Sequence, residues 1–259
     1  MWLDRIFKFR AKPGEAGGDA TKPFLDHLED LRWMLARMGG AVAISMMLCF
    51  CFRHTLVDII EYPLLQVDPA AQLRTQGPTD SFTISLTLAF YAGLVVSFPL
   101  LLYFLAQFVL PALTHKEKKI VLPAIGVGSA LFITGVSFSY FVILPRALAW
   151  FWKDTHSFHW DSYWMAPQYF SFVTQITLVF GLAFELPVAV LALVHFGLLS
   201  FDFLNRTRSY AIVLVLVLAM IIAPSPDLLT FVSLGAPMCL LYEACIWLAW
   251  LMERRRKKG

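Results

Sequence analysis

Long apolar stretches with few or no charged residues dominate this chain. Residues 81–114 and 120–145 carry no charge, and residues 162–201 carry only Glu185. Because a bilayer core of about 30 Å is crossed by roughly 20 helical residues, stretches of this length predict membrane-spanning helices. Three further apolar stretches bring the predicted number to six. The predicted spans are residues 33–52, 82–106, 120–144, 168–195, 209–223 and 229–250.

The predicted fold class is all-α, a polytopic membrane protein with a single integral-membrane domain over residues 1–259. Continuous apolar runs favour helices, which satisfy their own backbone groups in lipid, over the alternating pattern of barrel strands. The composition agrees, since 59% of residues are hydrophobic and 15% charged, against about 25% charged in a soluble domain. The first span lacks a small-residue cleavage site, so it is predicted to stay in the membrane.

Basic residues predict the orientation. The two long connections at residues 53–80 and 146–161 hold four of the 21 Lys and Arg residues and six acidic residues. The other seventeen lie in the 1–37 region, near residues 116 and 206, and in the 251–259 tail. The positive-inside rule therefore predicts that both termini, including the N-terminal arm at residues 1–32, are cytoplasmic. The basic tail is a topology anchor that also attracts anionic lipid, or a docking segment.

Glu185 is the clearest polar residue within a predicted span. It lies on the order of 15 residues into the fourth span, too deep to reach the interface. Such groups usually line a path or a binding surface in membrane proteins. The alternative is a packing role, with hydrogen bonds to a neighbouring helix and a kink at Pro187. Glu243 and Gln175 lie nearer the ends of their spans, where either could reach water.

The fifth span is short, because Pro224 and Pro226 force a turn after about 22 Å of helix. Either the membrane thins there or the last helix pair is tilted or interfacial.

The four cysteines fall inside predicted spans and are interpreted as small buried side chains. No cofactor or metal site is predicted, and motifs of soluble enzymes are missing, so the chain is not expected to be an enzyme.

Carboxylates also cluster just outside the lipid on the predicted cytoplasmic side. Asp26, Glu29, Asp30 and Glu117 could pair with arginines of a ligand through bidentate hydrogen bonds. Local salt bridges to Arg32 or to neighbouring lysines are the ordinary alternative.

Several motifs occur in the order of a known family. Residues 24–32 (FLDHLEDLR) resemble an N-terminal HLxELR segment, and residues 180–187 resemble an FGxxFExP segment. Residues 108–119 are similar to the first cytoplasmic loop of that family. Pro63 resembles a proline in its first outer loop. Residues 224–227, together with Glu243, resemble its last helical hairpin. Together these motifs resemble the TatC family over nearly the whole chain.

The resemblance implies a receptor for twin-arginine signal peptides of folded cargo proteins. It also implies a concave bundle with short fifth and sixth helices in the bacterial inner membrane, TatA-like and TatB-like partners in an oligomeric complex, and transport driven by the proton-motive force. Nucleic acid is not an expected partner. By position, Asp30, Arg32, Phe108 and Glu117 would bind the signal peptide, and Glu185 would be an intramembrane polar site. Pro63, Asp227 and Glu243 would serve structure or assembly.

Three positions depart from the family pattern. Asp30 stands where glutamate is usual, Met34 where a basic residue is common, and Phe231 where the family often carries glutamine.

A proton-coupled secondary transporter of a small solute is the main alternative function, since one buried carboxylate among six helices also suits a carrier. No internal repeat supports that alternative. An intramembrane enzyme would need a nucleophile and a base in facing spans.

Overall fold

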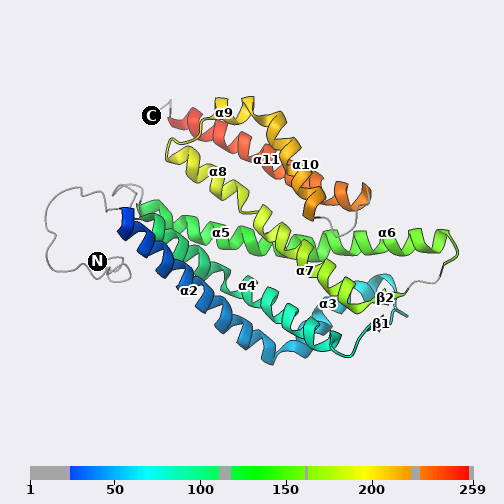
Figure 1. The fold of residues 1–259 in the computed structure, drawn as a ribbon. Coiled ribbons are helices and arrows are strands. Elements are labelled where there is room, and N and C mark those ends of the chain that lie inside the picture. Colours follow the sequence, from blue (N-terminus) through cyan, green and yellow to red (C-terminus); the bar gives the residue numbers. More distant parts are fainter. Residues whose placement is uncertain (1–23, 111–117, 161–162, 223–227, 257–259) are drawn as a thin grey trace.

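The computed structural model describes residues 24–110, 118–160, 163–222 and 228–256, and these residues are almost entirely helical (Figure 1). One pair of two-residue parallel strands is the exception to the all-α prediction. The elements in chain order are α2 (Phe24–Cys51), α3 (Arg53–Val67), β1 (Leu73–Arg74), α4 (Asp80–Val109), α5 (Lys118–Phe138), the π-helical turn η2 (Ser139–Ile143), α6 (Leu144–Ser157), β2 (Trp164–Met165), α7 (Ala166–Ala183), α8 (Leu186–His195), α9 (Phe201–Arg206), α10 (Arg208–Ile222) and α11 (Leu228–Arg256).

Four helical stretches are long and apolar enough to cross a membrane by length and composition. They are His27–Cys51, Asp80–Val109, Val121–Ser157 and Ala166–His195. These stretches match the first four predicted spans in order. The apolar helices Arg208–Val217 and Gly235–Leu251 are shorter and lie in the region of the fifth and sixth predicted spans.

Two helices extend beyond their predicted spans. The helix of the third predicted span continues past residue 144 through η2 and α6 to Ser157. Pro145 directly follows the π-helical turn η2, where the regular α-helical hydrogen-bond pattern is already interrupted. The sixth helix is not short, since α11 has 29 residues and reaches Arg256. Its last turns are held by Glu253, whose Oε1 accepts a hydrogen bond of 2.7 Å from the backbone N–H of Phe201.

Glycines allow the closest approaches between helices. α2 packs along α4, and a Cβ added to Gly93 would lie 2.6 Å from the backbone nitrogen of Met46. α5 packs on α7 in a similar way, because a Cβ on Gly135 would lie 2.6 Å from the carbonyl oxygen of Phe180. Small residues at such crossings suit a lipid solvent, in which helices associate through close packing.

The main core lies where α3, α4, α6 and α7 meet. Leu88, Leu144, Val173 and Phe180 are each almost completely buried there. Beside this core, the rings of Phe98 and Phe132 stack with centroids 3.6 Å apart and join α4 to α5.

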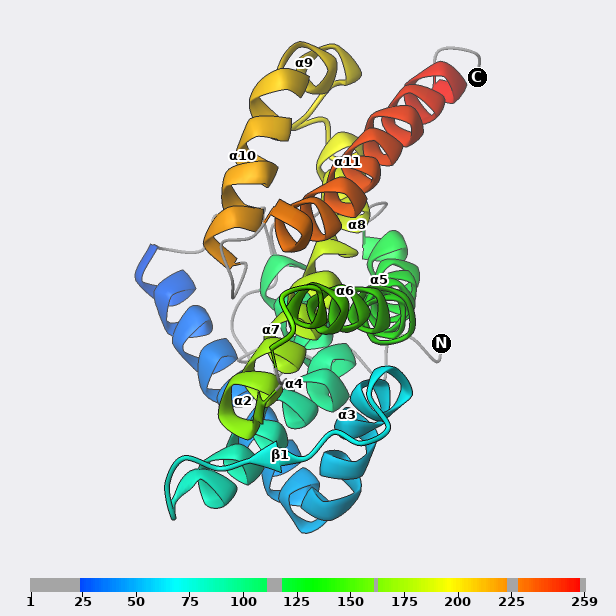
Figure 2. The ribbon, with the colours of Figure 1, turned by 90° about the vertical axis from the view of Figure 1, so that its right-hand side faces the viewer.

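Hydrogen bonds from two tyrosine hydroxyls fix α3 to the bundle. Figure 2 shows α3 and β1 together at one end of the molecule. The Tyr140 hydroxyl donates to the carbonyl of Ile59 at 2.5 Å, and the Tyr169 hydroxyl donates to the carbonyl of Ile60 at 2.6 Å. β1 and β2 pair in parallel, Leu73 opposite Trp164. The two connections that precede α4 and α7 therefore form one unit with α3.

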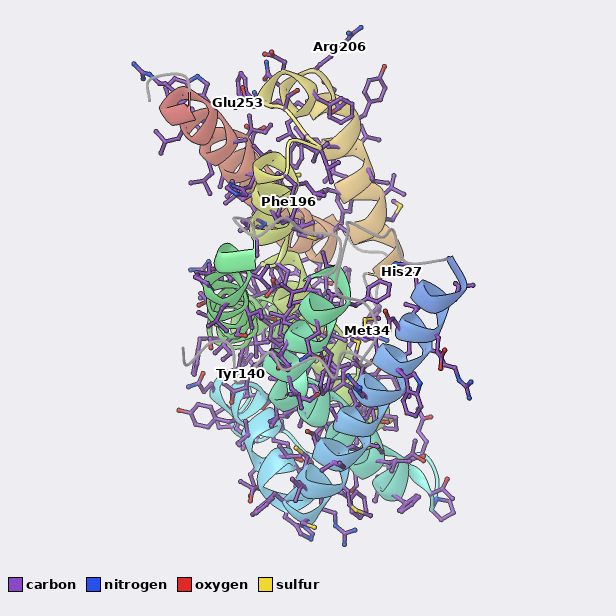
Figure 3. All side chains as sticks on the ribbon, turned by 90° about the vertical axis from the view of Figure 1, so that its left-hand side faces the viewer. His27, Met34, Tyr140, Phe196, Arg206 and Glu253 are labelled. Atoms are coloured by element: carbon purple, nitrogen blue, oxygen red, sulfur yellow. The ribbon has the colours of Figure 1, made fainter. Side chains whose placement is uncertain are left out.

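A second, smaller core joins α8 to the C-terminal helices. Val194, Leu204, Tyr242 and Ile246 are buried together, and the Tyr242 hydroxyl donates to the carbonyl of Leu204 at 3.2 Å. Figure 3 shows the labelled side chains of Phe196, Arg206 and Glu253 at this end of the molecule, away from Tyr140.

Replacing Gly93 with alanine should destabilise the protein by about 1–3 kcal/mol, because the added methyl group meets backbone atoms of α2 that cannot move independently. Gly126→Ala is the matched control, since nothing lies within 4 Å of its added Cβ. Thermal unfolding of the purified proteins in detergent measures the difference. Equal melting temperatures for the two variants would show that the α2–α4 approach is looser than described.

The stability contribution of Glu61 on α3 should depend on pH. Burial, with a smaller effect of the neighbouring Asp58 charge, raises the pKa of Glu61 above its ordinary value of 4.5. The folded protein therefore binds this proton more tightly than the unfolded chain, and its stability falls as pH rises through the unfolded and then the folded pKa.

Glu61→Gln should be more stable than the parent at pH 7 and should lose most of this pH dependence. Asp58→Asn should give a smaller change of the same sign, because it removes the lesser cause. Melting temperatures measured from pH 4 to pH 8 check both expectations. A parent and Glu61→Gln variant with parallel pH curves would contradict them.

Candidate functional site

One face of α2 and one face of α4 enclose a cleft of about 110 Å³ at the end of the bundle where α2 begins. The α2 residues follow helical spacing, i, i+3, i+4 and i+7, and the α4 residues follow i, i+3 and i+4, so each set forms a single stripe. The lining residues are Asp30, Trp33, Met34 and Arg37 from α2 with Phe104, Gln107 and Phe108 from α4.

The cleft combines aromatic walls with groups of both charges. The ring of His27, one turn before Asp30 on α2, stacks on Phe108 with centroids 4.4 Å apart and an interplanar angle of 20°. Met34 is 9% exposed and forms an apolar part of the wall, and Figure 3 shows it on the side of α2 that faces α4. A carboxylate, a guanidinium and an amide thus lie beside ring faces, an arrangement suited to a peptide with basic and apolar side chains.

The structure brings together part of the predicted signal-peptide site. Asp30 and Phe108 line the same cleft, whereas Arg32 is exposed and does not line it. Glu117 lies outside the described residues. Its place in the sequence is eight residues after Val109, the last residue of α4.

Other cleft residues were not predicted from the sequence: His27, Trp33, Arg37, Phe104 and Gln107. The helical spacing on α2 and the single amide of Gln107 in an otherwise apolar span were the available signals. Neither signal indicates which turns of α2 and α4 pack side by side.

Glu185 lies at a break between α7 and α8. The helix stops at Ala183, and the new helix starts at Leu186 with a proline in its first turn. The carboxylate faces α5 and α4, because a Cβ on Gly128 would lie 3.0 Å from Glu185 Oε2 and 3.1 Å from Leu102 Cδ1. Within the described residues, Glu185 Oε1 is buried without a hydrogen-bond partner.

The remaining predicted residues occupy varied surroundings. Glu243 on α11 forms an ion pair with Arg208 at the start of α10, with Oε1 and Nε 2.5 Å apart. This contact ties the two helices together and gives Glu243 a partner in the protein rather than in water alone. Pro63 is buried within α3, and Asp227 lies outside the described residues. No three His, Cys, Asp or Glu side chains gather as metal ligands in the described part of the chain.

Comparison with known proteins identifies the family of this chain. The family model described as Sec-independent protein translocase protein (TatC) matches residues 26–237. A Sec-independent protein translocase protein TatC of Akkermansia muciniphila is 47% identical over 69% of this chain, and the match spans 51% of that relative's length. The TatC of Desulforapulum autotrophicum is 33% identical over 88% of this chain and 84% of its own length.

A solved structure supports the fold independently. The crystal structure of a twin arginine translocase receptor, TatC, superposes with a TM-score of 0.80 at 32% identity, covering 87% of this chain and 98% of the other. The family is one of protein translocases rather than enzymes. Its members share membrane-spanning helices of the kind found here. The chain therefore belongs to the TatC family of Sec-independent protein translocase proteins.

Proposed function

We propose that this protein is the signal-peptide receptor and core subunit of a twin-arginine translocase. In this proposal it exports folded proteins across the bacterial inner membrane and uses the proton-motive force. It has six spans with both termini in the cytoplasm, and TatA-like and TatB-like subunits are its partners. The observation that carries the proposal is the cleft between α2 and α4, in a chain whose family and fold are those of TatC.

The cleft suits an arginine-containing peptide. Asp30 supplies a carboxylate, which can accept two parallel hydrogen bonds from one guanidinium, and an ammonium group cannot reproduce that geometry. Phe104, Phe108 and Trp33 supply ring faces on which a guanidinium or an apolar side chain packs. Arg37 also lines the cleft. Its positive charge repels the basic groups of a ligand, so a ligand with basic residues and no apolar residues is disfavoured. Glu117 would add a second carboxylate from the chain after α4.

The solute-carrier alternative has less support. Among the described residues, the cleft of Asp30 opens at a helix end, and the buried carboxylate of Glu185 lies elsewhere, at the break between α7 and α8. A carrier would use the buried carboxylate as its substrate site. The family match favours the receptor.

Photocrosslinking in membranes tests the receptor proposal. A photoreactive residue at Phe104 should crosslink to a signal peptide with an Arg-Arg pair and at least several-fold less to its Lys-Lys counterpart. A probe at Leu105, which is exposed on the same helix and does not line the cleft, is the positional control.

Asp30→Asn should lower the Arg-Arg crosslink by about tenfold, since a charge-assisted hydrogen bond contributes about 1.5–3 kcal/mol. Glu29→Gln is its matched control, because Glu29 is an exposed neighbouring carboxylate outside the cleft lining. Equal labelling at both probe positions, or equal effects of the two substitutions, would reject this cleft as the binding site.

Glu185 is proposed as a polar contact for the transported polypeptide. Glu185→Leu should keep or raise thermal stability, because it removes a buried oxygen that lacks a partner among the described residues. Export of a folded cargo should fall strongly, and Glu185→Gln should retain part of it. Melting temperature and export assay are read on the same variants. Loss of stability together with export would indicate a packing role instead.

A further inference from the structure

A second cavity lies at the opposite end of the chain's long helices from the α2–α4 cleft, between α6, β2 and α7. It has a volume of about 360 Å³, within the range of small-molecule and acyl-chain sites. Its lining residues are Leu148, Phe151, Tyr163, Trp164, Met165, Gln168, Tyr169 and Phe172.

The wall of this cavity is mostly apolar, although Gln168 contributes an amide and Tyr163 a hydroxyl. Trp164 donates its indole N–H to Asp68 Oδ2 at 3.1 Å, and Tyr169 donates its hydroxyl to the carbonyl of Ile60. Both polar tips are thereby bound to α3 and the segment after it, so the rings present their faces and edges. Phe151 and Phe172 meet edge to face with centroids 5.8 Å apart. A polar solute would find few partners on such a surface.

One positive charge lies at the rim. The guanidinium of Arg74 sits over the ring of Tyr163, 4.3 Å from its centroid. Among the described residues, Asp68 accepts a hydrogen bond from Trp164, and Asp80 Oδ2 accepts from the backbone N–H groups of Gln76 and Gly77. Arg74 forms no ion pair among the described residues.

The cavity lies at the depth of a membrane interface. The helical stretch Val121–Ser157 is about 55 Å long, whereas a bilayer core is about 30 Å thick, so a core that begins near Val121 ends near the start of α6. α7 begins at Ala166, beside the cavity. Four of the eight tryptophans lie between residues 150 and 164, as in the aromatic belts that mark a membrane surface.

We propose that this cavity holds one acyl chain of an anionic phospholipid, with the lipid phosphate at Arg74. An alkyl chain matches the dry aromatic wall, and a phosphate complements the rim charge at the depth where lipid headgroups begin. This lipid would lie beside β1 and β2, where the connections before α4 and α7 meet.

Photolabelling of the full chain in lipid nanodiscs tests the proposal. A phosphatidylglycerol with a diazirine in its acyl chain should label Phe151 and Phe172 above the level of lipid-exposed residues such as Phe141, which is 70% exposed. Gln168→Trp, which fills the cavity from an exposed lining position, should abolish this enrichment. Ser171→Trp is the matched control, because Ser171 is exposed on the same helix and does not line the cavity.

Arg74→Gln should lower the preference for phosphatidylglycerol over phosphatidylethanolamine probes about fivefold, the factor that corresponds to about 1 kcal/mol for one basic residue near an anionic surface. Arg53→Gln is the control, since Arg53 also lies over an aromatic ring, that of Phe50. Labelling spread evenly over lipid-facing residues, equal effects of the two tryptophan variants, or equal effects of the two arginine variants would each overturn the proposal. Crosslinking of the cavity to another protein in place of lipid would overturn it as well.

Discussion

The absence of a hydrophobic driving force between helices in lipid is the constraint on which this structure depends. Helices that are already surrounded by hydrocarbon gain little from apolar burial, so they associate through close packing and a few polar contacts. Gly93 brings α4 onto the backbone of α2, and Gly181 receives the ring of Phe132, whose Cε2 would lie 2.7 Å from an added Cβ. These approaches set the positions of α2, α4, α5 and α7, and therefore of the cleft and of Glu185.

Much of the fold is predictable from the sequence because apolar length is a direct consequence of bilayer thickness. The first four spans are predicted from long apolar runs, although the first contains Arg37 and the fourth contains Glu185. The continuation through α6 is not predicted in this way, since Pro145 and Arg146 together resemble the end of a span. A proline also suits the first turn of a new helix, and only packing of α6 on α3 and α7 distinguishes the two cases. α11 is longer than predicted for a similar reason, because Glu253 binds the start of α9, 52 residues earlier in the chain.

The candidate cleft was predictable in part. Asp30 and Phe108 were named from the resemblance to TatC, and the structure places both in one lining. The sequence does not place Trp33, Phe104 and Gln107 in one cleft, because their proximity depends on the relative shift of α2 and α4 along their axes. That shift is determined at Gly93 and Met46, several turns away from the cleft. A local sequence pattern does not show how two helices are shifted relative to each other. That shift follows from the contacts along the full length of α2 and α4.

Glu243, Asp30 and Glu185 illustrate how the surroundings of a carboxylate separate structural from functional groups. Glu243 contacts Arg208, whose side chain is about half exposed, so the Glu243 charge has a partner within the protein. Asp30 lies in a cleft that also contains Arg37 and open space for a ligand. Glu185 Oε1 has no partner among the described residues, although it is buried beside Gly128. A group whose desolvation is not offset within the resting fold destabilises that fold, and such a group is retained where another molecule supplies its partner.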